Sequence, residues 1–447
     1  MKIVDCYLHE ALETYRIPGL AVAVARHGEI VYAGGLGFRD VERGLPVTPE
    51  TVFGVASVTK SFTCLAVMQL ATEGRLSPFD PVVRWLPEFA AILPPDGAGV
   101  QVRHLMSHTS GLPGLRALYY ARAGSIRRDP DWRRLGARDP FGVDPIRTVA
   151  ELMALMAATE IAPLGPPGTV LNYSNEGYAL LQAIIERAAG CPFRQYLQER
   201  LLDPLGMAHS TILESDLARF PEVTELYAPE PGGYFHSPAW WDVGDIYTNG
   251  SLKSTVLDLI RYLEVYRTGG AGIVPPAAVA DMVTPVITMP TGTRYAYGLT
   301  IQPGYHGHTL IGHGGSIKGV SAQVMLVPEA DLTVALLINV TGAPAERIAL
   351  SVANAFLGLP LETYKYEFPA YTPAPGELDE LAGTYHSDEM GAVEISTGSE
   401  GVTVKAAGQT IPVRPFARQA LVSADGLTQV RGLPGAIFMG LRVYRRR

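Results

Sequence analysis

Ser57 and Lys60 lie three residues apart at the start of an apolar segment, in the sequence Ser57-Val58-Thr59-Lys60. Residues with this spacing share one face of a helix, so the hydroxyl and the amine can meet. A lysine removed from water tends to lose its proton and can then accept one from serine. Arginine would not serve, because it keeps its charge in proteins. The chain has only six lysines among its 36 basic residues, and one of them stands here. The pair predicts a serine nucleophile with a lysine base.

The residues after Lys60 predict a buried helix. There is no regular polar face between Phe62 and Leu70, and Gly74 is a typical C-terminal stop. We expect Ser57 to cap the N-terminus of this helix. The tetrapeptide alone also fits a surface lysine in a first helical turn, but a lysine on a buried helix requires a functional reason.

The triplet Tyr-Ser-Asn at 173–175 is the second candidate element. A phenol at Tyr173, held partly ionised by the lysine, could carry a proton to the leaving group. The amide of Asn175 could orient the lysine or a substrate carbonyl. The triplet Tyr-Thr-Asn at 247–249 competes with it, so that Tyr247 is an alternative proton shuttle. A loop rich in proline and glycine precedes the first triplet, and for this reason we favour the first.

The third element is His-Gly-Gly-Ser at 313–316, which lies at the end of a predicted edge strand. Two glycines let the backbone approach a substrate closely. The backbone N–H groups of Ser57 and Ser316 could form an oxyanion hole. The residues expected to bind and orient the substrate are His313, Gly314 and Gly315, although a histidine beside glycines is often purely structural. A Ser-His-Asp hydrolase is a competing interpretation, but the chain has no Gly-x-Ser-x-Gly motif.

The composition is that of a globular protein with a large core, since 47% of the 447 residues are hydrophobic and 18% are charged. A formal net charge of −8 argues against a nucleic-acid partner. We expect no membrane span and no secretory leader, because no sufficiently long apolar run is present. The three cysteines are expected to be reduced thiols in a cytoplasmic protein. No motif with metal-ligand spacing is present, so we expect neither a metal nor a cofactor.

The elements that must position these residues predict a mixed α/β (α+β) fold. Strand patterns occur at both ends of the main region, at 20–34, 308–313, 321–327 and 332–340. Helical patterns lie between them, at 148–158, 176–189, 192–201 and 254–267. Residues 101–113 are expected to form a loop, and 114–148 a surface excursion. This order indicates an antiparallel sheet flanked by helices, with a helical insertion.

The chain is expected to divide into a hydrolase domain at 1–365 and a small all-β domain at 377–447. The segment 366–376 contains three prolines and a glycine, which is typical of a linker. Short strand patterns that alternate with glycine turns follow it. They predict a meander or a partial barrel.

With the three elements in this order, the chain resembles the serine β-lactamase and penicillin-binding-protein superfamily. It is nearest to the class C-like group of D-stereospecific peptidases, DD-carboxypeptidases and family VIII esterases. Further similar stretches lie at 103–112, 173–178, 254–259 and 312–319. The resemblance implies a β-lactamase-like fold and four roles: acylated nucleophile for Ser57, base for Lys60, proton shuttle for Tyr173 and orienting group for Asn175. The C-terminal domain, which opens with Leu-Ala-Gly-Thr-Tyr at 381–385, resembles lipocalin-like domains appended to some of these peptidases.

The chain departs from β-lactamases at His313, where those enzymes usually carry a lysine. A neutral histidine is a weaker anchor for an anion, so efficient β-lactam turnover is not expected. Lys318 could supply the missing charge, but we expect it to be a lysine on a loop surface. Two aromatic pairs, Trp240-Trp241 and Tyr119-Tyr120, could line an acyl pocket, although such pairs more often cover a core or a surface.

The expected function is hydrolysis through an acyl-enzyme on Ser57, acting on small amides and above all on short peptides with D-amino acids. A carboxylesterase is the alternative, and a weak β-lactamase or a non-catalytic penicillin-binding homologue is less favoured. The expected partners are a small molecule or short peptide as substrate, and further copies of the chain in a homo-oligomer.

Overall fold

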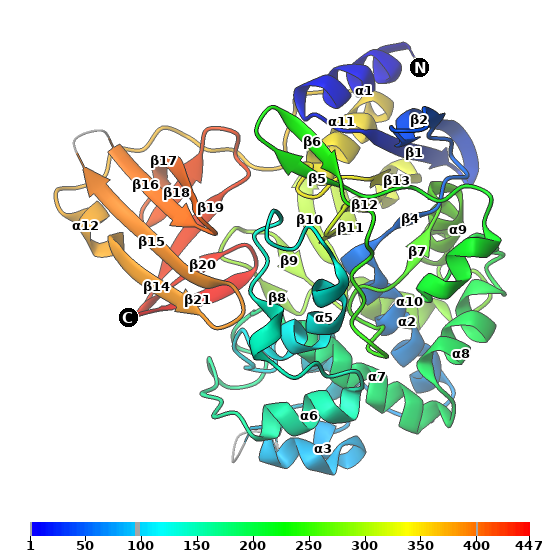
Figure 1. Cartoon of the computed structure of the whole chain (residues 1–447), viewed down its shortest axis with the longest axis horizontal. Coiled ribbons are helices and arrows are strands. Elements are labelled where there is room, and N and C mark those ends of the chain that lie inside the picture. The colour runs from blue at the N-terminus through cyan, green and yellow to red at the C-terminus, as the bar shows by residue number, and fades with distance from the viewer. Residues whose placement is uncertain (1, 94–98, 399–400) are drawn as a thin grey trace.

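The computed structural model describes residues 2–93, 99–398 and 401–447. A larger part with a central sheet and covering helices lies beside a smaller barrel built from the C-terminal strands (Figure 1). The expected mixed α/β fold with an antiparallel sheet is confirmed.

The central sheet has nine antiparallel strands in the order β3-β2-β1-β13-β12-β11-β10-β9-β8. The strand bounds are β1 Gly19–Arg26, β2 Glu29–Asp40, β3 Leu45–Pro46, β8 Ile287–Thr288, β9 Arg294–Tyr295, β10 Thr300–Tyr305, β11 His308–Ile317, β12 Val320–Val327 and β13 Leu332–Ile338. The N-terminal hairpin joins the later strands because β1 pairs with β13, with Leu20 opposite Ile338. Residues from both ends of the larger part therefore form one sheet.

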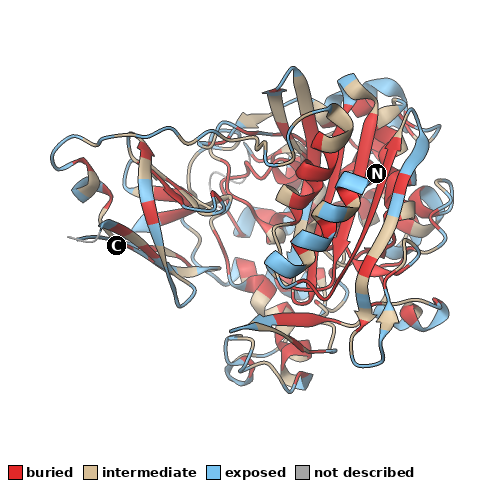
Figure 2. Cartoon of the chain, turned by 90° about the horizontal axis from the view of Figure 1, so that it is seen from above, coloured by how far each residue is buried: buried red, intermediate tan, exposed pale blue. Residues whose placement is uncertain are grey.

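Both faces of this sheet are buried (Figure 2). Successive side chains of a strand point to opposite faces, and β1 follows this rule: Leu20 and Val22 pack in one core, whereas Ala21 and Ala23 pack in the other. Helices α1 (Lys2–Thr14) and α11 (Ala345–Leu357) cover the first face. Helices α2 (Thr59–Thr72) and α9 (Val256–Arg267) cover the second.

The helical insertion lies beyond α2. Its helices are α3 Val82–Trp85, α4 Val102–Met106, α5 Ala117–Arg128, α6 Val149–Ala157, α7 Asn175–Ala189, α8 Phe193–Leu197 and α10 Pro276–Val283. Helix α7 starts at the Ser174 cap, whose hydroxyl accepts from the N–H of Gly177, and ends at Gly190 in a left-handed conformation. The helices predicted at 148–158, 176–189 and 254–267 are thus present, and the one predicted at 192–201 continues past α8 as a π-helical turn, Gln198–Leu202.

Two predictions for this insertion were wrong. The loop predicted at 101–113 begins with α4, because Gln101 and His104 form a capping box that starts a helix there. The predicted surface excursion contains α5, which buries Leu118, Ala121 and Ile126. Two short strand pairs complete the larger part: β4 (Phe53–Gly54) with β7 (Lys253–Ser254), and β5 (Tyr227–Glu230) with β6 (Gly233–His236).

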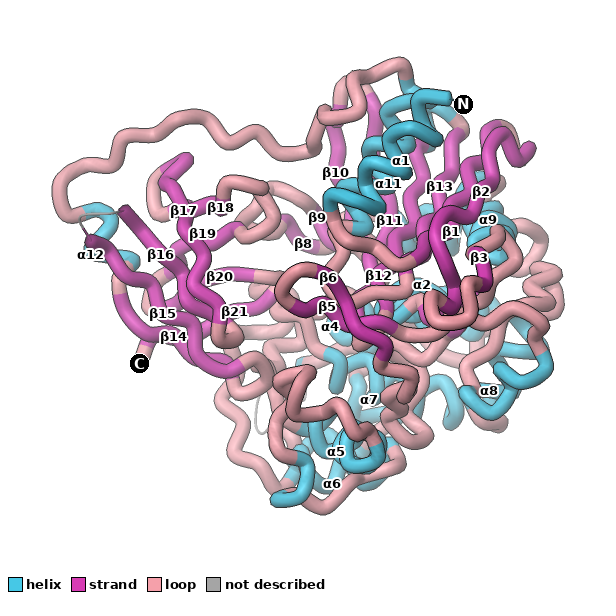
Figure 3. Tube along the Cα trace, turned by 45° about the horizontal axis from the view of Figure 1, so that its top comes forward, coloured by secondary structure: helices cyan, strands magenta, loops and turns pink. Residues whose placement is uncertain are grey.

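The C-terminal strands form a closed barrel rather than a partial one, because β14 pairs with β21. Its strands are β14 Gly383–Ser387, β15 Gly391–Gly398, β16 Gly401–Ala406, β17 Gln409–Ala417, β18 Ala420–Ser423, β19 Gln429–Leu433, β20 Ala436–Met439 and β21 Arg442–Arg446. A short helix, α12 (Glu377–Leu381), precedes them. Between α11 and α12 the chain runs as a long loop from the sheet to the barrel (Figure 3).

Candidate active site

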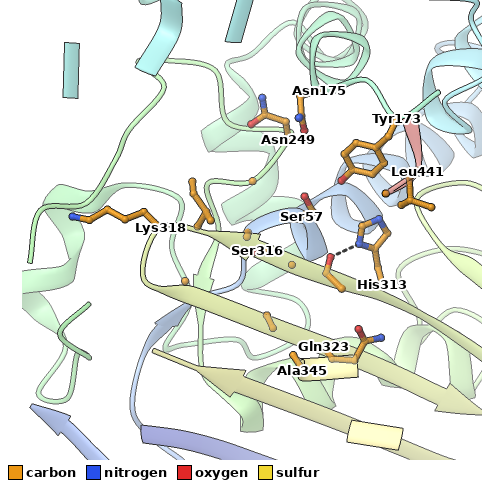
Figure 4. A pocket seen from close by; sticks show the side chains of 18 of the residues that line it. Ser57, Tyr173, Asn175, Asn249, His313, Ser316, Lys318, Gln323, Ala345 and Leu441 are labelled. Carbon is orange, nitrogen blue, oxygen red and sulfur yellow. Dashed lines mark hydrogen bonds between the residues drawn. The ribbon is translucent and has the colours of Figure 1, made fainter. Parts of the chain in front are cut away.

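A cavity of about 940 Å³ lies where the sheet, the helical insertion and the barrel meet. Its lining includes residues from each of the three motifs, among them Ser57, Tyr173, Asn175 and His313 (Figure 4). Segments far apart in sequence therefore bring the candidate residues together.

Ser57 stands in a 3₁₀ turn, Ala56–Val58, immediately before α2. The prediction that Ser57 caps the helix was wrong: the cap position is Val58, and no side chain in the described part of the chain caps this end. The serine hydroxyl instead accepts a hydrogen bond from Lys60 Nζ at 3.1 Å. Ala56 has φ 45°, a left-handed conformation that is strained for alanine. This turn directs the Ser57 hydroxyl into the cavity.

Lys60 is completely buried and held at three points. Its Nζ donates to Ser57 Oγ, to Asn175 Oδ1 at 2.8 Å and to the backbone carbonyl of Asn249. Burial lowers the pKa of Lys60 well below its ordinary value of 10.5, and the nearby charge of Arg442 lowers it further. A neutral amine at hydrogen-bond distance from a serine hydroxyl can act as its general base.

Tyr173 is buried beside both residues: its phenol is hydrogen-bonded to Ser57, and Lys60 Nζ lies 4.8 Å from the centroid of its ring. Burial raises the pKa of Tyr173 above its ordinary value of 10, although the bond to Ser57 and the charge of Arg442 act in the opposite direction. The phenol is therefore protonated at neutral pH, and the expected partial ionisation is not supported. A protonated phenol can still relay a proton between Ser57 and a leaving group.

In the competing triplet at 247–249, the residue that contacts the candidate site is Asn249, whereas the sequence suggested Tyr247. The Tyr247 hydroxyl donates to Asp245 at 2.8 Å, and its ring is only half-buried. Asn249, by contrast, binds Lys60 through its backbone carbonyl. The structure thus brings Tyr173, rather than Tyr247, to Ser57.

Strand β11 runs past the nucleophile. A Cβ atom on Gly315 would lie 2.2 Å from the backbone oxygen of Val55, so only glycine allows the strand this close to the turn that carries Ser57. Among the described residues, the pairing of β11 with β10 extends no further along β11 than Gly312. Gly312 directs its carbonyl to the β10 side, where Thr300 donates to it. The backbone N–H and C=O groups of every second residue in a strand point to the same side. The backbone groups of the exposed Gly314 and the N–H of Ser316 therefore point the same way as the Gly312 carbonyl, and face the cavity.

The predicted edge strand was therefore wrong in one respect. Strand β11 lies inside the sheet, between β12 and β10, and 313–316 lies near its end. His313 lines the cavity, but its Nε2 is 3.0 Å from the hydroxyl of Tyr295 and its Nδ1 is 2.6 Å from the carbonyl of Gly314. Burial and the nearby Lys60 lower the pKa of His313 to about 4, so the ring is neutral at neutral pH.

Lys318 is not the surface lysine that we expected. Its side chain is 3% exposed and forms an ion pair with Asp129 at 2.9 Å. The same carboxylate accepts a hydrogen bond of 2.7 Å from the indole of Trp241. Trp240 and Trp241 both line the cavity, whereas Tyr119 and Tyr120 are absent from the lining among the described residues.

Sequence reasoning did not single out the residues of the barrel that contribute to the site. Glu389, from the loop between β14 and β15, forms a bidentate ion pair with Arg442 of β21, with N–O distances of 2.7 and 2.8 Å. Arg442 also lies over the ring of Tyr173, 5.0 Å from its centroid. The backbone of Leu441 accepts from the N–H of Tyr173 at 2.9 Å. No local sequence signal marks these residues, because their role depends on where the barrel docks.

A buried histidine behind Tyr173 was also missed. The rings of His108 and Tyr173 are 4.1 Å apart, and Nδ1 of His108 accepts from the N–H of Ser174 at 3.1 Å. His108 therefore supports the shuttle from behind. The stretch 103–112, which carries part of the family resemblance, contained this signal.

Comparison with known proteins identifies the family. The chain belongs to the Beta-lactamase family, whose profile matches residues 4–357. A solved structure described as the octameric penicillin-binding protein homologue from Pyrococcus abyssi has a TM-score of 0.74 and 29% identity, and the match covers 99% of each chain. The resemblance stated from the motifs is thereby confirmed, and so is the fold with its C-terminal barrel.

Curated relatives carry different names. Esterase EstB from Burkholderia gladioli is 36% identical over 51% of this chain, and a D-aminopeptidase from Gluconobacter oxydans is 28% identical over 84% of it. The match spans 55% of the esterase and 64% of the aminopeptidase, less than two thirds of either.

Within the described residues, no group of three or more histidine, cysteine, aspartate or glutamate side chains could hold a metal ion. No helix in the same residues has both the length and the apolar character to cross a membrane.

Proposed function

We propose that the protein is a serine hydrolase that cleaves small amides, in particular short peptides with D-amino acids, through an acyl-enzyme on Ser57. The observation that carries the proposal is the buried Lys60, whose Nζ lies 3.1 Å from the Ser57 hydroxyl. Burial lowers the pKa of this amine and so favours the neutral form that a general base needs. The names of relatives add support, since they include D-aminopeptidases.

In the proposed first half-reaction, the Ser57 oxygen attacks the amide carbonyl carbon while its proton passes to Lys60. The N–H groups of Ser57 and Ser316 stabilise the oxyanion. The C–N bond then breaks, and the leaving amine receives the proton through Tyr173. In the second half-reaction a water molecule attacks the ester, its proton passes to the same base, and Ser57 is released with its proton restored while the acid departs.

Two groups hold this machinery in place. Asn175 accepts from Lys60 and keeps the amine pointed at Ser57. The glycine at 315 places β11 against the nucleophile turn, which sets the distance between the two oxyanion donors. His313 has both ring nitrogens engaged, so in this proposal it shapes the cavity wall beside Tyr173 rather than anchoring an anion.

A carboxylesterase is the second candidate. The 36% identity to an esterase favours it, and esters react with the same machinery because they are easier acyl donors. β-Lactam turnover is less favoured, because His313 is neutral where a cation would hold the β-lactam carboxylate.

The test is an assay of wild type and Ser57→Ala on D- and L-amino-acid p-nitroanilides and on short-chain p-nitrophenyl esters. The proposal expects anilide cleavage with a D preference that disappears in Ser57→Ala. Ester cleavage without anilide cleavage would favour the esterase. Inactivity on both would contradict the hydrolase and favour a non-catalytic homologue.

We also propose a cytoplasmic location and self-association, the latter because the solved Pyrococcus abyssi homologue is octameric.

A further inference from the structure

The contact between Lys60 and Asn249 depends on where a whole segment of the chain lies. The acceptor is a backbone carbonyl, so its position is set by residues 248–252, the bridging segment, rather than by a side chain. This segment lies beside the nucleophile turn, because a Cβ atom on Gly250 would be 3.6 Å from the carbonyl carbon of Ala56. Whatever holds the bridging segment therefore also helps to hold the proposed base.

The hydroxyl of Thr59 joins the bridging segment to the nucleophile turn. It donates to the carbonyl of Ala56 at 2.6 Å and accepts from the N–H of Leu252 at 3.2 Å. All three residues are buried, so a lost bond would leave a polar group without water. Ala56 is in a strained left-handed conformation, which persists only where its surroundings fix it. A hydroxyl can donate and accept at once, whereas a valine of the same shape can do neither.

Thr63 contacts the bridging segment one helical turn further along α2. Its hydroxyl donates to the carbonyl of Thr248 at 2.8 Å, and both residues are fully buried. Residues four apart share one face of a helix, so Thr59 and Thr63 face the segment together. Neither threonine is among the described residues that line the cavity. Contact with a substrate therefore does not account for these two hydroxyls.

We propose that Thr59 and Thr63 are positioning residues: their hydroxyls fix the bridging segment against the nucleophile turn and so set the distance between nucleophile and base. This inference rests on the proposed function and adds two groups that act through Ser57 and Lys60 without touching a substrate. If the segment moves away, Lys60 loses the Asn249 carbonyl and its amine is free to turn from the serine. A displacement of about 1 Å in such a site can slow the reaction about 10²-fold.

The first test measures the reactivity of Ser57 with a fluorophosphonate, so that the natural substrate is not needed. In this reaction the Ser57 oxygen attacks phosphorus, fluoride leaves and the serine proton passes to the base. Intact-protein mass spectrometry gives kinact and KI for wild type, Thr59→Val, Thr59→Ser and the control Thr72→Val. Thr72 lies on the same helix, where its hydroxyl donates to the carbonyl of Met68 at 2.9 Å.

We expect Thr59→Val to lower kinact about 10- to 100-fold. Its KI should stay within about twofold of wild type, because Thr59 is not among the described residues of the cavity lining. Thr59→Ser keeps the hydroxyl, so its kinact should stay within about twofold of wild type, as should that of Thr72→Val. A merely structural role would lower the melting temperature of Thr59→Val and leave kinact unchanged. That result, or an equal loss of kinact in Thr59→Ser, would overturn the proposal.

Hydrogen–deuterium exchange follows the bridging segment itself and needs no reaction. We expect the N–H of Leu252 to exchange at least about tenfold faster in Thr59→Val than in wild type, and at the wild-type rate in Thr72→Val. If wild type resists the fluorophosphonate, the proposed function fails, and exchange alone decides the role of Thr59: faster exchange supports it and unchanged exchange overturns it. If Thr59→Val does not fold, Thr63→Val carries both tests, with kinact lowered at least about threefold. Wild-type behaviour of Thr63→Val would then overturn the proposal.

Discussion

Glu389 of the barrel and Asn175 at the start of α7 lie within hydrogen-bond distance, with 3.3 Å between Oε1 and Nδ2. The other end of the Asn175 amide accepts from Lys60. A carboxylate 214 residues away in sequence thus orients the amide that holds the proposed base. The barrel is therefore part of the candidate site and not an appendage to it.

We predict that Glu389→Gln weakens both the fold and the activity. The change leaves Arg442 buried without a counter-charge, which costs about 3–5 kcal/mol of unfolding free energy for such pairs. It also frees the Asn175 amide to turn away from Lys60. Denaturant unfolding and kcat/KM are the measurements. The control is Asp388→Asn, an exposed acid on the same loop, and equal behaviour of the two variants would contradict this account.

The two competing tyrosines give a matched pair of variants. Tyr173→Phe removes the hydroxyl that is bonded to Ser57, and we predict a fall in kcat of about 10²- to 10⁴-fold, as for the loss of a proton-transfer group. Tyr247→Phe removes a hydroxyl that donates to Asp245, and its kcat should stay within about twofold of wild type. The reverse order of effects would assign the shuttle to Tyr247.

The pH dependence of kcat/KM should follow the ionisation of Lys60. Only the neutral amine of Lys60 can accept a proton, so kcat/KM rises as pH increases through its pKa and then levels off. Because burial lowers this pKa, the plateau should begin well below pH 10.5, and a rise that continues to that pH would contradict the assignment. Lys60→Arg, which stays charged at every accessible pH, should be inactive across the whole profile while its far-UV circular dichroism remains that of wild type.

Gly315→Ala tests the distance between β11 and the nucleophile. Its Cβ would meet the Val55 carbonyl at 2.2 Å, so the strand must move and carry the N–H of Ser316 with it. Loss of one oxyanion donor typically lowers kcat about 10²- to 10³-fold. Gly233→Ala, where a Cβ would meet nothing within 4 Å, serves as the control, and a Gly315→Ala variant as active as this control would show that the close approach is not needed.

Contacts between residues that are close in the chain could be predicted from the sequence. The meeting of Ser57 and Lys60 follows from helical spacing alone, and the caps of α7 follow from Ser174 and Gly190. The order of strands and helices predicted the antiparallel sheet with its insertion. One local prediction was wrong, namely that Ser57 caps α2: its hydroxyl bonds to Lys60 instead.

Contacts between segments that are distant in the chain could not be predicted from the sequence. Lys318 looked like a loop lysine because its partner, Asp129, lies in the helical insertion. Glu389 comes from a barrel loop and Arg442 from strand β21, and both acquire their role only once the barrel docks. In each case the role of the charged side chain depends on where the fold places it relative to the cavity. Its neighbours in the sequence do not reveal that position.

The central claim is that Ser57 forms the acyl-enzyme. The most direct measurement is intact-protein and peptide mass spectrometry after wild type is mixed with p-nitrophenyl acetate and quenched rapidly in acid. The account predicts one added acetyl group located on Ser57, and none in Ser57→Ala. Acetylation at another residue, or turnover by the enzyme without any acylated Ser57, would contradict it.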